Sequence, residues 1–587
     1  MLFVNELIIG RELMENEKTF KLCLTMAGAV SAGAYTAGVL DYLLETLELW
    51  EKAKVLNRSR GVNHPDYDHS IPMHQVEIDV MSGSSAGGIS GSLTLLALAD
   101  KNYKSINKEN PNGIDNIFYR SWVEMADTKD SSTIDKLLGD KDLKEFGEVR
   151  SLLNTKAIDD IAAEAIRIRE QREIPKYASD SLDVILTTTN LRGINFLVNF
   201  DGSRDSSKGT VITNHGGFFR YKLQNDKYKS GIPESEDELY YVLDISKKKH
   251  LQYLKDATLS TAAFPIGLRS REVAISSEYI KRYPKYLFNQ SRGIEPLLPE
   301  GDIYTFNSVD GGVINNEPYG IALKVLKEKN PKSIEACRYG VIMIDPFPNK
   351  DKDVSKSGKS ISSIAKGLLR SLRNQVMFNQ EGILDALDLS DRTKFLIEPV
   401  RKIKKNGEWV RSKNDLASAP IGGFAGFLSR DFRAHDFQLG RKNCQDFLRY
   451  YFAIPSEEIE TRLSIKPNAE IKERFEFSVP PMDVKGDKLF PIIPDMRVLR
   501  NFINKFDTET YGKDADIQVL PFPKLSISDF QNHYKSKIKN RIGLIVKYLL
   551  KNRFLSFLAN FFYAKNAGYK FVKETIEKEL AENDLLK

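Results

Sequence analysis

Short apolar runs in the first half of the chain alternate with segments whose apolar residues recur every three or four positions. Phe20–Thr25 has the length of a strand, and the apolar residues between 39 and 47 have helical spacing. Val76–Met81 and Leu93–Ala99 repeat this order of strand and helix. Later strands are predicted at Val184–Thr189, Thr305–Val309 and Tyr339–Ile344. The alternation predicts an α/β fold with a mainly parallel central sheet covered on both faces.

Polar segments divide the chain. Asn57–His74 is predicted to be a polar insertion, and Asp201–His215, which is rich in Gly, Ser and Asp, is predicted to be a loop. Residues 349–363 are rich in Lys, Ser and Asp and are predicted to be a linker, after which the pattern is mostly helical. We therefore expect one domain at residues 15–350 and a mainly helical C-terminal region at residues 364–587.

Composition narrows the class of protein. The chain has 587 residues, of which 41% are hydrophobic and 28% charged, as in a globular protein with a large core. Its net charge of +6 does not by itself indicate nucleic-acid binding. The three cysteines are far apart, which argues against a disulfide framework and a thiolate zinc site. Without a signal-peptide pattern or a run of about 20 apolar residues, we expect a protein kept in a reducing cytoplasm, or exported without a cleaved signal.

Gly83-Ser84-Ser85-Ala86-Gly87 is a Gly-x-Ser-x-Gly pentapeptide between a predicted strand and a predicted helix. This is the context of a nucleophile elbow, in which the serine hydroxyl stands at the start of a helix. Gly83 and Gly87 suit so tight a turn because side chains there would collide with their neighbours. Ser85 is therefore a candidate nucleophile, and a plain strand-to-helix turn is the alternative interpretation.

A serine esterase also needs a base and donors for the oxyanion. Asp310-Gly311-Gly312 follows an apolar strand, and open α/β sheets place their sites at the carboxyl ends of strands. Asp-Gly is also common in ordinary turns. The small-residue turn Ala27–Gly33 offers consecutive backbone N–H groups. None of the seven histidines lies in a convincing strand-end motif after the elbow.

Taken together, these segments resemble patatin-like phospholipases. Residues 24–40 (LTMAGAVSAGAYTAGVL) are similar to the glycine-rich opening of that family, and residues 82–91 (SGSSAGGISG) to its nucleophile elbow. Thr261–Pro265 and Val309–Gly312 resemble its Ala/Phe/Pro turn and its Asp-Gly-Gly motif, in the family's order. Further segments similar to a bacterial branch with a long C-terminal extension are residues 190–193, 315–318 and 431–444. The resemblance covers most of residues 20–460.

The resemblance implies a three-layer α/β hydrolase with a Ser–Asp dyad and no catalytic histidine. By position, Ser85 is the nucleophile and Asp310 the base. The N–H groups of Gly28, Ala29 and Val30 form the implied oxyanion hole. The implied reaction is hydrolysis of acyl esters of phospholipids or lysophospholipids through an acyl-enzyme. No cofactor and no metal are expected, and calcium dependence is not expected either.

The oxyanion turn departs from the family pattern. Many members have a run of glycines and an arginine there, whereas Ala29 and Val30 replace glycines here and Ala32 stands at the place of the arginine. Backbone N–H donors survive a change from Gly to Ala where φ remains allowed. The sequence therefore retains an oxyanion hole but leaves open whether the altered turn lowers activity or changes the head-group preference.

Three histidines recur every five residues in the polar insertion, at His64, His69 and His74. Imidazole and carboxylate groups suit several divalent metals. A solvated loop is the favoured interpretation, and no metal site is predicted.

His435, Asp436 and Arg441 belong to the segment DFRAHDFQLGRKNC. Contact with a lipid head group is one interpretation of these charged side chains. A buried structural network is the favoured one.

Residues 535–570 contain no acidic residue but nine Lys or Arg residues, interleaved with apolar ones. A basic amphipathic helix of this kind can lie on an anionic membrane surface. Alternatively, its apolar side packs on the body of the protein, and both interpretations stay open. Nucleic-acid binding is not expected, because no nucleic-acid motif accompanies the basic residues.

A lipid acyl hydrolase is thus the predicted function. Three alternatives remain. An alcohol can intercept the same acyl-enzyme, which would make the protein an acyltransferase. The altered oxyanion turn fits a catalytically weak protein that binds lipid or membrane. A histidine-assisted mechanism is the third, with His215 as the candidate.

Overall fold

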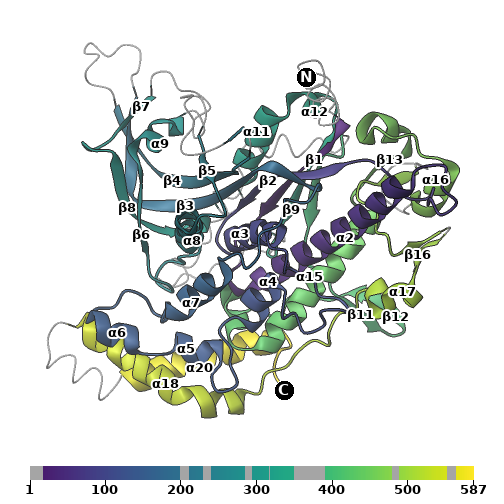
Figure 1. The fold of residues 1–587 in the computed structure, drawn as a ribbon. Coiled ribbons are helices and arrows are strands. Elements are labelled where there is room, and N and C mark those ends of the chain that lie inside the picture. Colours follow the sequence, from purple (N-terminus) through teal and green to yellow (C-terminus); the bar gives the residue numbers. More distant parts are fainter. Residues whose placement is uncertain are drawn as a thin grey trace.

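The computed structural model describes residues 18–198, 210–225, 227–228, 239–284, 294–315, 318–348, 391–478, 488–500, 502–550 and 564–587. Within these residues a ten-stranded sheet forms the centre, with the path β10-β9-β1-β2-β3-β4-β5, and helices flank it (Figure 1). Its strands are β1 (Phe20–Met26), β2 (Val76–Gly83), β3 (Ala178–Val198), β4 (Thr210–Leu223), β5 (Tyr241–Leu243), β6 (Arg271–Ser276), β7 (Ile294–Leu297), β8 (Ile303–Asp310), β9 (Tyr339–Ile344) and β10 (Lys394–Ile397).

The flanking helices come from both halves of the chain. They are α2 (Gly33–Arg60), α3 (Ala86–Ala99), α4 (Ile117–Tyr119), α5 (Thr133–Leu137), α6 (Lys141–Phe146), α7 (Lys156–Ala165), α8 (Lys248–Thr261), α9 (Ser277–Lys281), α11 (Tyr319–Lys329), α12 (Pro331–Glu335), α15 (Arg430–Tyr450), α16 (Ala469–Phe475), α17 (Thr508–Tyr511), α18 (Ile527–Leu549) and α20 (Lys565–Glu582). Small two-stranded sheets pair β11 (Lys402–Lys405) with β12 (Glu408–Arg411), β13 (Ala453–Pro455) with β14 (Leu489–Pro491), and β15 (Val498–Leu499) with β16 (Phe502–Phe506).

The parallel part of the sheet confirms the predicted α/β fold. Strands β10, β9, β1, β2 and the first part of β3 run parallel to one another. Every residue of β1 is buried, which is why its sequence is mostly apolar rather than alternating. Its charged residue, Lys21, pairs with Glu77 at 3.3 Å. Helix α3 packs on β1, β2 and β3, and α11 packs on β1 and β2. The predicted strands and the first two predicted helices all occur.

Strand β3 is long enough to have two sets of neighbours. Its first half lies between β2 and β4, and its second half pairs antiparallel with β8 and β7. The same length corrects one prediction. Residues 210–215, expected to be part of a loop, belong to β4, because residues 194–198 of β3 pair antiparallel with residues 210–214. The rest of that predicted loop, residues 201–209, lies outside the described residues.

The C-terminal region is mainly helical, as predicted, and packs closely on the first half of the chain. Helix α15 lies along α2 (Figure 1). At their crossing, a Cβ on Gly38 would lie 1.9 Å from the carbonyl oxygen of Phe437, and one on Gly440 would lie 2.1 Å from that of Tyr35. Glycine at both positions lets the two backbones touch. The predicted linker, residues 349–363, lies outside the described residues.

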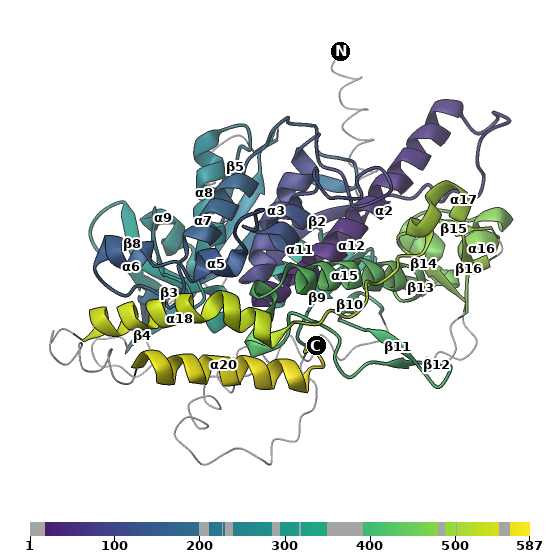
Figure 2. The same ribbon diagram turned by 90° about the horizontal axis from the view of Figure 1, so that it is seen from below.

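Helices α18 and α20 lie side by side along one edge of the molecule (Figure 2). Phe530 and Ile538 of α18 share a small apolar core with Tyr569 and Ile576 of α20. Arg541 is buried, and two of its nitrogens each lie 2.9 Å from the Asp142 carboxylate. Part of the apolar side of the predicted basic segment therefore packs on the protein, whereas its residues 551–563 lie outside the described residues. No helix in the described part of the chain has the length and apolar character needed to cross a membrane.

His74 is built into the core rather than into a solvated loop. Its Nε2 lies 2.8 Å from the carbonyl oxygen of Ile492, and its ring packs on Trp50 with centroids 4.7 Å apart. Its Nδ1 is buried and has no hydrogen-bond partner among the described residues. Burial lowers the pKa of His74 to about 3, since a charged imidazole is poorly solvated there.

Acid is therefore expected to destabilise the fold through His74. The unfolded imidazole takes up a proton below about pH 6.5 and the folded one only near pH 3, so between these values the unfolded state binds more protons. Stability should fall by about 2–3 kcal/mol between pH 7 and about pH 4.5 from this group. Urea unfolding at both pH values would measure the loss. His74→Gln should reduce it, whereas replacement of the exposed His533 by glutamine should not, and equal acid sensitivity of the two variants would contradict the assignment.

Candidate active site

Ser85 stands in the turn between β2 and α3. Its φ of 54° and ψ of −123° are strained values for a residue with a side chain. A Cβ on Gly83 would lie 2.3 Å from the carbonyl oxygen of Gly87, and one on Gly87 would lie 2.1 Å from that of Met26. Both glycines are thus required by backbone contacts, and the turn has the geometry of a nucleophile elbow.

The Ser85 hydroxyl donates a hydrogen bond of 2.5 Å to Oδ2 of Asp310. Both side chains are nearly enclosed, with Ser85 7% and Asp310 3% exposed. The N–H of Gly312 donates to Oδ1 of the same carboxylate at 2.7 Å and so fixes its orientation. The Asp310 backbone is held by the carbonyl of Ala263 and the hydroxyl of Thr189, each at 2.9 Å. A hydroxyl and a buried carboxylate are therefore brought together in a fixed arrangement.

Asp310 reaches the elbow from an unexpected direction. Strand β8 runs antiparallel to β3, so the expectation drawn from the carboxyl ends of parallel strands does not explain its position. Because β3 continues beyond the end of β2, β8 can pair with it there, with Asp310 opposite Thr188. A Cβ on Gly311 would lie 2.5 Å from the carbonyl oxygen of Thr187, so the glycine permits this close approach.

Thr261 has a structural role at the elbow that the sequence did not reveal. It lies at the end of α8, and its Oγ1 accepts the backbone N–H of Ser85 at 3.0 Å. It is the first residue of the Thr261–Pro265 segment, but a single threonine carries no sequence signal for this contact. The hydroxyl satisfies a buried backbone donor at the strained residue.

Loss of this acceptor is expected to destabilise the protein. Thr261→Val removes the hydroxyl at nearly constant volume and leaves the Ser85 N–H buried without a partner, at a cost of about 1–3 kcal/mol. Thr261→Ser keeps the acceptor and should lose less. Urea unfolding of the two variants measures the difference, and equal stability of both would show that the hydrogen bond contributes nothing.

The turn after β1 lies directly beside the elbow. The N–H of Ser84 donates to the carbonyl of Met26 at 3.1 Å, which joins the two segments. Within the described residues, the N–H groups of Gly28, Ala29 and Val30 donate to no protein acceptor. Val30 has a φ of 50° although it is not glycine, so the turn keeps an unusual backbone despite its altered residues. Unengaged donors in a turn beside the elbow are suited to binding an oxyanion.

A comparison with protein families places the chain in one of them. The model of the family described as "Patatin-like phospholipase" matches residues 24–323, which is about half of the chain and includes the elbow, the oxyanion turn and Asp310. The chain belongs to the patatin-like phospholipase family. Residues 324–587 follow the matched region.

A curated relative and a solved structure are among the proteins that are similar to the chain. The relative is "Uncharacterized protein y4iI" of Sinorhizobium fredii (strain NBRC 101917 / NGR234), which is 30% identical over 471 residues. The match covers 75% of this chain and 65% of the relative, so the chain spans about 65% of that protein's length. The solved structure is VipD from Legionella pneumophila, at 12% identity over 96% of this chain and 87% of that chain. Its TM-score of 0.21 is too low for any structural argument.

His215 and the histidines of the polar insertion do not belong to the candidate active site of this patatin-like chain. His215 is exposed, and its Nδ1 lies 2.7 Å from the carbonyl oxygen of Asn190, whereas the Ser85 hydroxyl bonds to Asp310. Of the three histidines of the polar insertion, His64 accepts the N–H of Asp66 and His69 packs on a tyrosine. Among the described residues, no three or more His, Cys, Asp or Glu side chains are grouped so as to hold a metal ion.

His435 and Asp436 of α15 belong to a buried network of hydrogen bonds. Both oxygens of the fully buried Asp436 accept backbone N–H groups, from Ala417 and Ser418 at 2.8 Å each. The His435 imidazole bonds to the same carboxylate at 2.8 Å. Neither side chain is available to a lipid head group, so the favoured structural interpretation of these two residues is confirmed.

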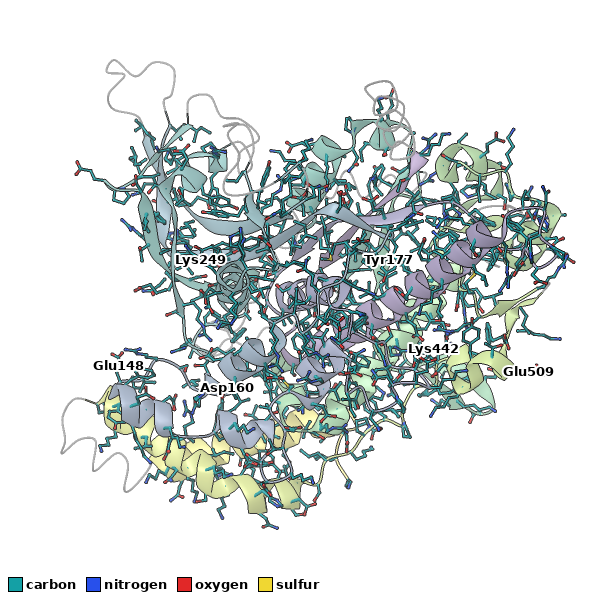
Figure 3. The ribbon with its side chains drawn as sticks, in the orientation of Figure 1. Glu148, Asp160, Tyr177, Lys249, Lys442 and Glu509 are labelled. Atoms are coloured by element: carbon teal, nitrogen blue, oxygen red, sulfur yellow. The ribbon has the colours of Figure 1, made fainter. Side chains whose placement is uncertain are left out.

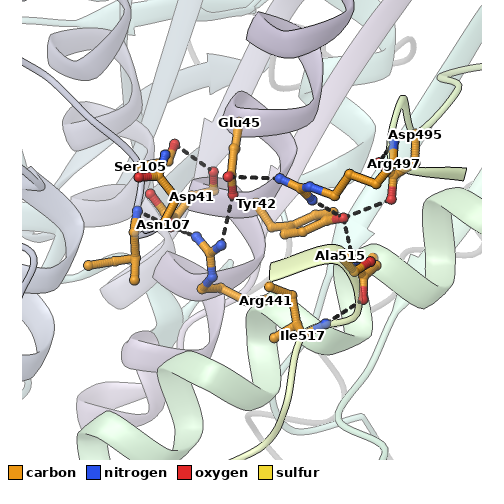
Figure 4. A network of polar contacts seen from close by, with 12 residues as sticks. Asp41, Tyr42, Glu45, Ser105, Asn107, Arg441, Asp495, Arg497, Ala515 and Ile517 are labelled. Atoms are coloured by element: carbon orange, nitrogen blue, oxygen red, sulfur yellow. Dashed lines mark hydrogen bonds and ion pairs between the residues drawn. The ribbon is translucent and has the colours of Figure 1, made fainter. Parts of the chain in front are cut away.

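Arg441 belongs to a second buried network, between α2 and α15 (Figure 4). Its guanidinium donates to the carboxylate of Asp41 and, at 2.7 Å, to that of Glu45. Arg497 forms an ion pair with the same Glu45 at 2.7 Å and donates to the hydroxyl of Tyr42. Burial raises the pKa of Asp41, and the nearby Arg441 opposes this rise. Arg441 thus neutralises two buried carboxylates and joins the C-terminal region to the sheet domain.

A separate cavity of about 480 Å³ lies between the end of α3, residues 115–128 and α7. Asp160 of α7, labelled in Figure 3, is one of its lining residues. Both arginines and carboxylates line it, including Arg120 and Glu164. Neither Ser85 nor Asp310 lines this cavity. The cavity is therefore separate from the candidate active site, which is identified by the hydrogen bond between Ser85 and Asp310.

Proposed function

We propose that this patatin-like protein is a serine acyl hydrolase of phospholipids or lysophospholipids, with Ser85 as nucleophile and Asp310 as base. The observation that carries the proposal is the 2.5 Å hydrogen bond from the Ser85 hydroxyl to the Asp310 carboxylate. The patatin-like domain is proposed to span residues 15–350, with the region 364–587 as its C-terminal extension.

The proposed reaction has two halves. Asp310 accepts the hydroxyl proton while Oγ of Ser85 forms a bond to the acyl carbonyl carbon. The N–H groups of Gly28, Ala29 and Val30 stabilise the oxyanion. Protonated Asp310 then gives its proton to the departing alkoxide, which leaves an acyl-enzyme. In the second half Asp310 deprotonates a water molecule, which attacks the acyl carbon. The bond from that carbon to Oγ of Ser85 then breaks, protonated Asp310 gives its proton to Oγ, and the fatty acid leaves.

A membrane surface is the proposed place of action. Lys535 and Lys547 on α18 are exposed, and Leu549 near its end is 63% exposed. Each basic residue near an anionic bilayer contributes about 1 kcal/mol to binding, and exposed apolar side chains add to this. We propose peripheral binding through α18, with part of its apolar side packed on the protein.

The test combines covalent labelling with product analysis. Wild-type protein should react with a fluorophosphonate probe and release fatty acid from phosphatidylcholine or lysophosphatidylcholine vesicles, and Ser85→Ala should do neither. Added glycerol distinguishes hydrolysis from acyl transfer, because a transferase would form a glyceride. A folded wild-type protein that resists the probe in the presence of vesicles would refute the proposal.

A further inference from the structure

Apolar side chains border the dyad on two sides. Val30 ends the oxyanion turn after β1. Phe264 follows Ala263, whose carbonyl holds the N–H of Asp310 at 2.9 Å. Phe264 is 39% exposed and Ile266 75% exposed, so this segment presents two large apolar side chains to solvent.

A turn from the C-terminal region lies against both of these segments. It consists of two short 3-10 helices, η5 (Ile421–Gly423) and η6 (Ala425–Phe427). A Cβ on Gly423 would lie 3.1 Å from the carbonyl oxygen of Ala29 and 3.3 Å from the Cβ of Val30. Phe424 packs edge-on against Phe264, with ring centroids 5.3 Å apart. The turn therefore bridges the two segments that flank the dyad.

Specific hydrogen bonds hold this turn in place. The hydroxyl of Ser31, next to Val30, donates to the carbonyl of Gly423 and accepts the N–H of Gly426 at 3.0 Å. The opposite segment is held as well, because the N–H of Leu152 donates to the carbonyl of Ile266 at 2.8 Å. The buried Arg541 of α18 in turn binds the carbonyl of Leu152. Both the C-terminal turn and the segment that contains Ile266 are thus anchored to the body of the protein.

The backbone is strained at the same places. Among the described residues, three β-branched residues have a positive φ: Val30 at 50°, Ile266 at 68° and Ile421 at 59°. For such side chains the left-handed region is a genuine outlier. Strain of this kind persists where the surrounding structure holds it, and it clusters at binding sites. All three residues lie in the segments that meet around the dyad.

We propose that Val30, Phe264, Ile266 and Phe424 form an acyl wall, which holds the fatty acyl chain of an ester bound at Ser85. The proposal rests on the proposed function and adds that the C-terminal region, through Phe424, sets the preference for chain length. An acyl chain is the occupant because the wall is apolar and begins at the oxyanion turn and beside Ala263, which binds the backbone of Asp310. Each methylene that such a surface removes from water strengthens binding. Phe424 lies outside residues 24–323, so the family-matched region alone lacks part of this wall.

The experiment compares the rates at which two fluorophosphonate probes label Ser85, one with an ethyl chain and one with a decyl chain. In Phe424→Ala the preference for the decyl probe should fall about tenfold, as expected for losing one or two methylene contacts. Phe264→Ala should lower the same ratio, because it removes the other partner of the contact with Phe424. Phe571→Ala is the matched control, because Phe571 is a 68% exposed phenylalanine on α20, away from the wall.

An unchanged ratio in folded Phe424→Ala and Phe264→Ala would overturn the acyl wall while leaving the proposed function intact. A similar fall in Phe571→Ala would also overturn it, because the effect would not be specific. If Phe424→Ala does not fold, Phe264→Ala decides alone. Wild-type protein that neither probe labels would refute the proposed function, and the acyl wall with it.

Discussion

Asp310→Asn is expected to lower kcat for ester hydrolysis by about 10²–10⁴, the usual contribution of a positioned general base. Asparagine keeps the shape of the side chain, and its oxygen can still accept the N–H of Gly312. It cannot take up the Ser85 proton at neutral pH. The fold should remain intact because the change removes one charge and no volume. Steady-state kinetics on a soluble ester, together with fluorophosphonate labelling rates, would measure the loss.

Ser85→Ala should abolish both turnover and labelling, because the bond-forming atom is gone. The neighbouring Ser84 offers a matched control. Its hydroxyl is buried and has no hydrogen-bond partner among the described residues, so Ser84→Ala should leave the rate within about tenfold of wild type. Substantial activity in a well-folded Asp310→Asn protein would show that another group deprotonates Ser85.

Arg441→Ala is expected to lower the free energy of unfolding by about 3–5 kcal/mol. The substitution leaves the carboxylates of Asp41 and Glu45 buried without the guanidinium that neutralises both (Figure 4). Burial already raises the pKa of Asp41 while Arg441 is present, and its removal should raise that pKa further. Because the network joins α2 to α15, the loss should appear in the unfolding of the whole molecule. Urea unfolding at neutral pH would measure it.

Arg430 on the same helix provides the comparison. Its guanidinium pairs with Glu124 at 2.5 Å, but 43% of its side chain is exposed. Solvent-exposed pairs contribute about 0–1 kcal/mol, so Arg430→Ala should change stability little. Similar losses for Arg430→Ala and Arg441→Ala would contradict the view that burial makes Arg441 important.

Local sequence determined the elements and the elbow. Phe20–Thr25 and Tyr339–Ile344 are predicted as strands because a strand covered on both faces is mostly apolar, and they correspond to β1 and β9. The elbow was predictable because Gly83, Ser85 and Gly87 lie within five consecutive residues and satisfy a local steric requirement. Such features depend on neighbours in the chain, so one sequence is enough to find them.

Only the tertiary structure decided how distant segments meet. Ser85 and Asp310 are 225 positions apart, and their contact depends on β8 pairing antiparallel with the extension of β3. Thr261 was not recognised as the acceptor for the Ser85 N–H, because a lone threonine has no distinctive pattern. The contact of Gly423 with Ser31 spans 392 positions. Pairings of this range follow from the packing of whole elements, which the spacing of residues along a chain does not encode.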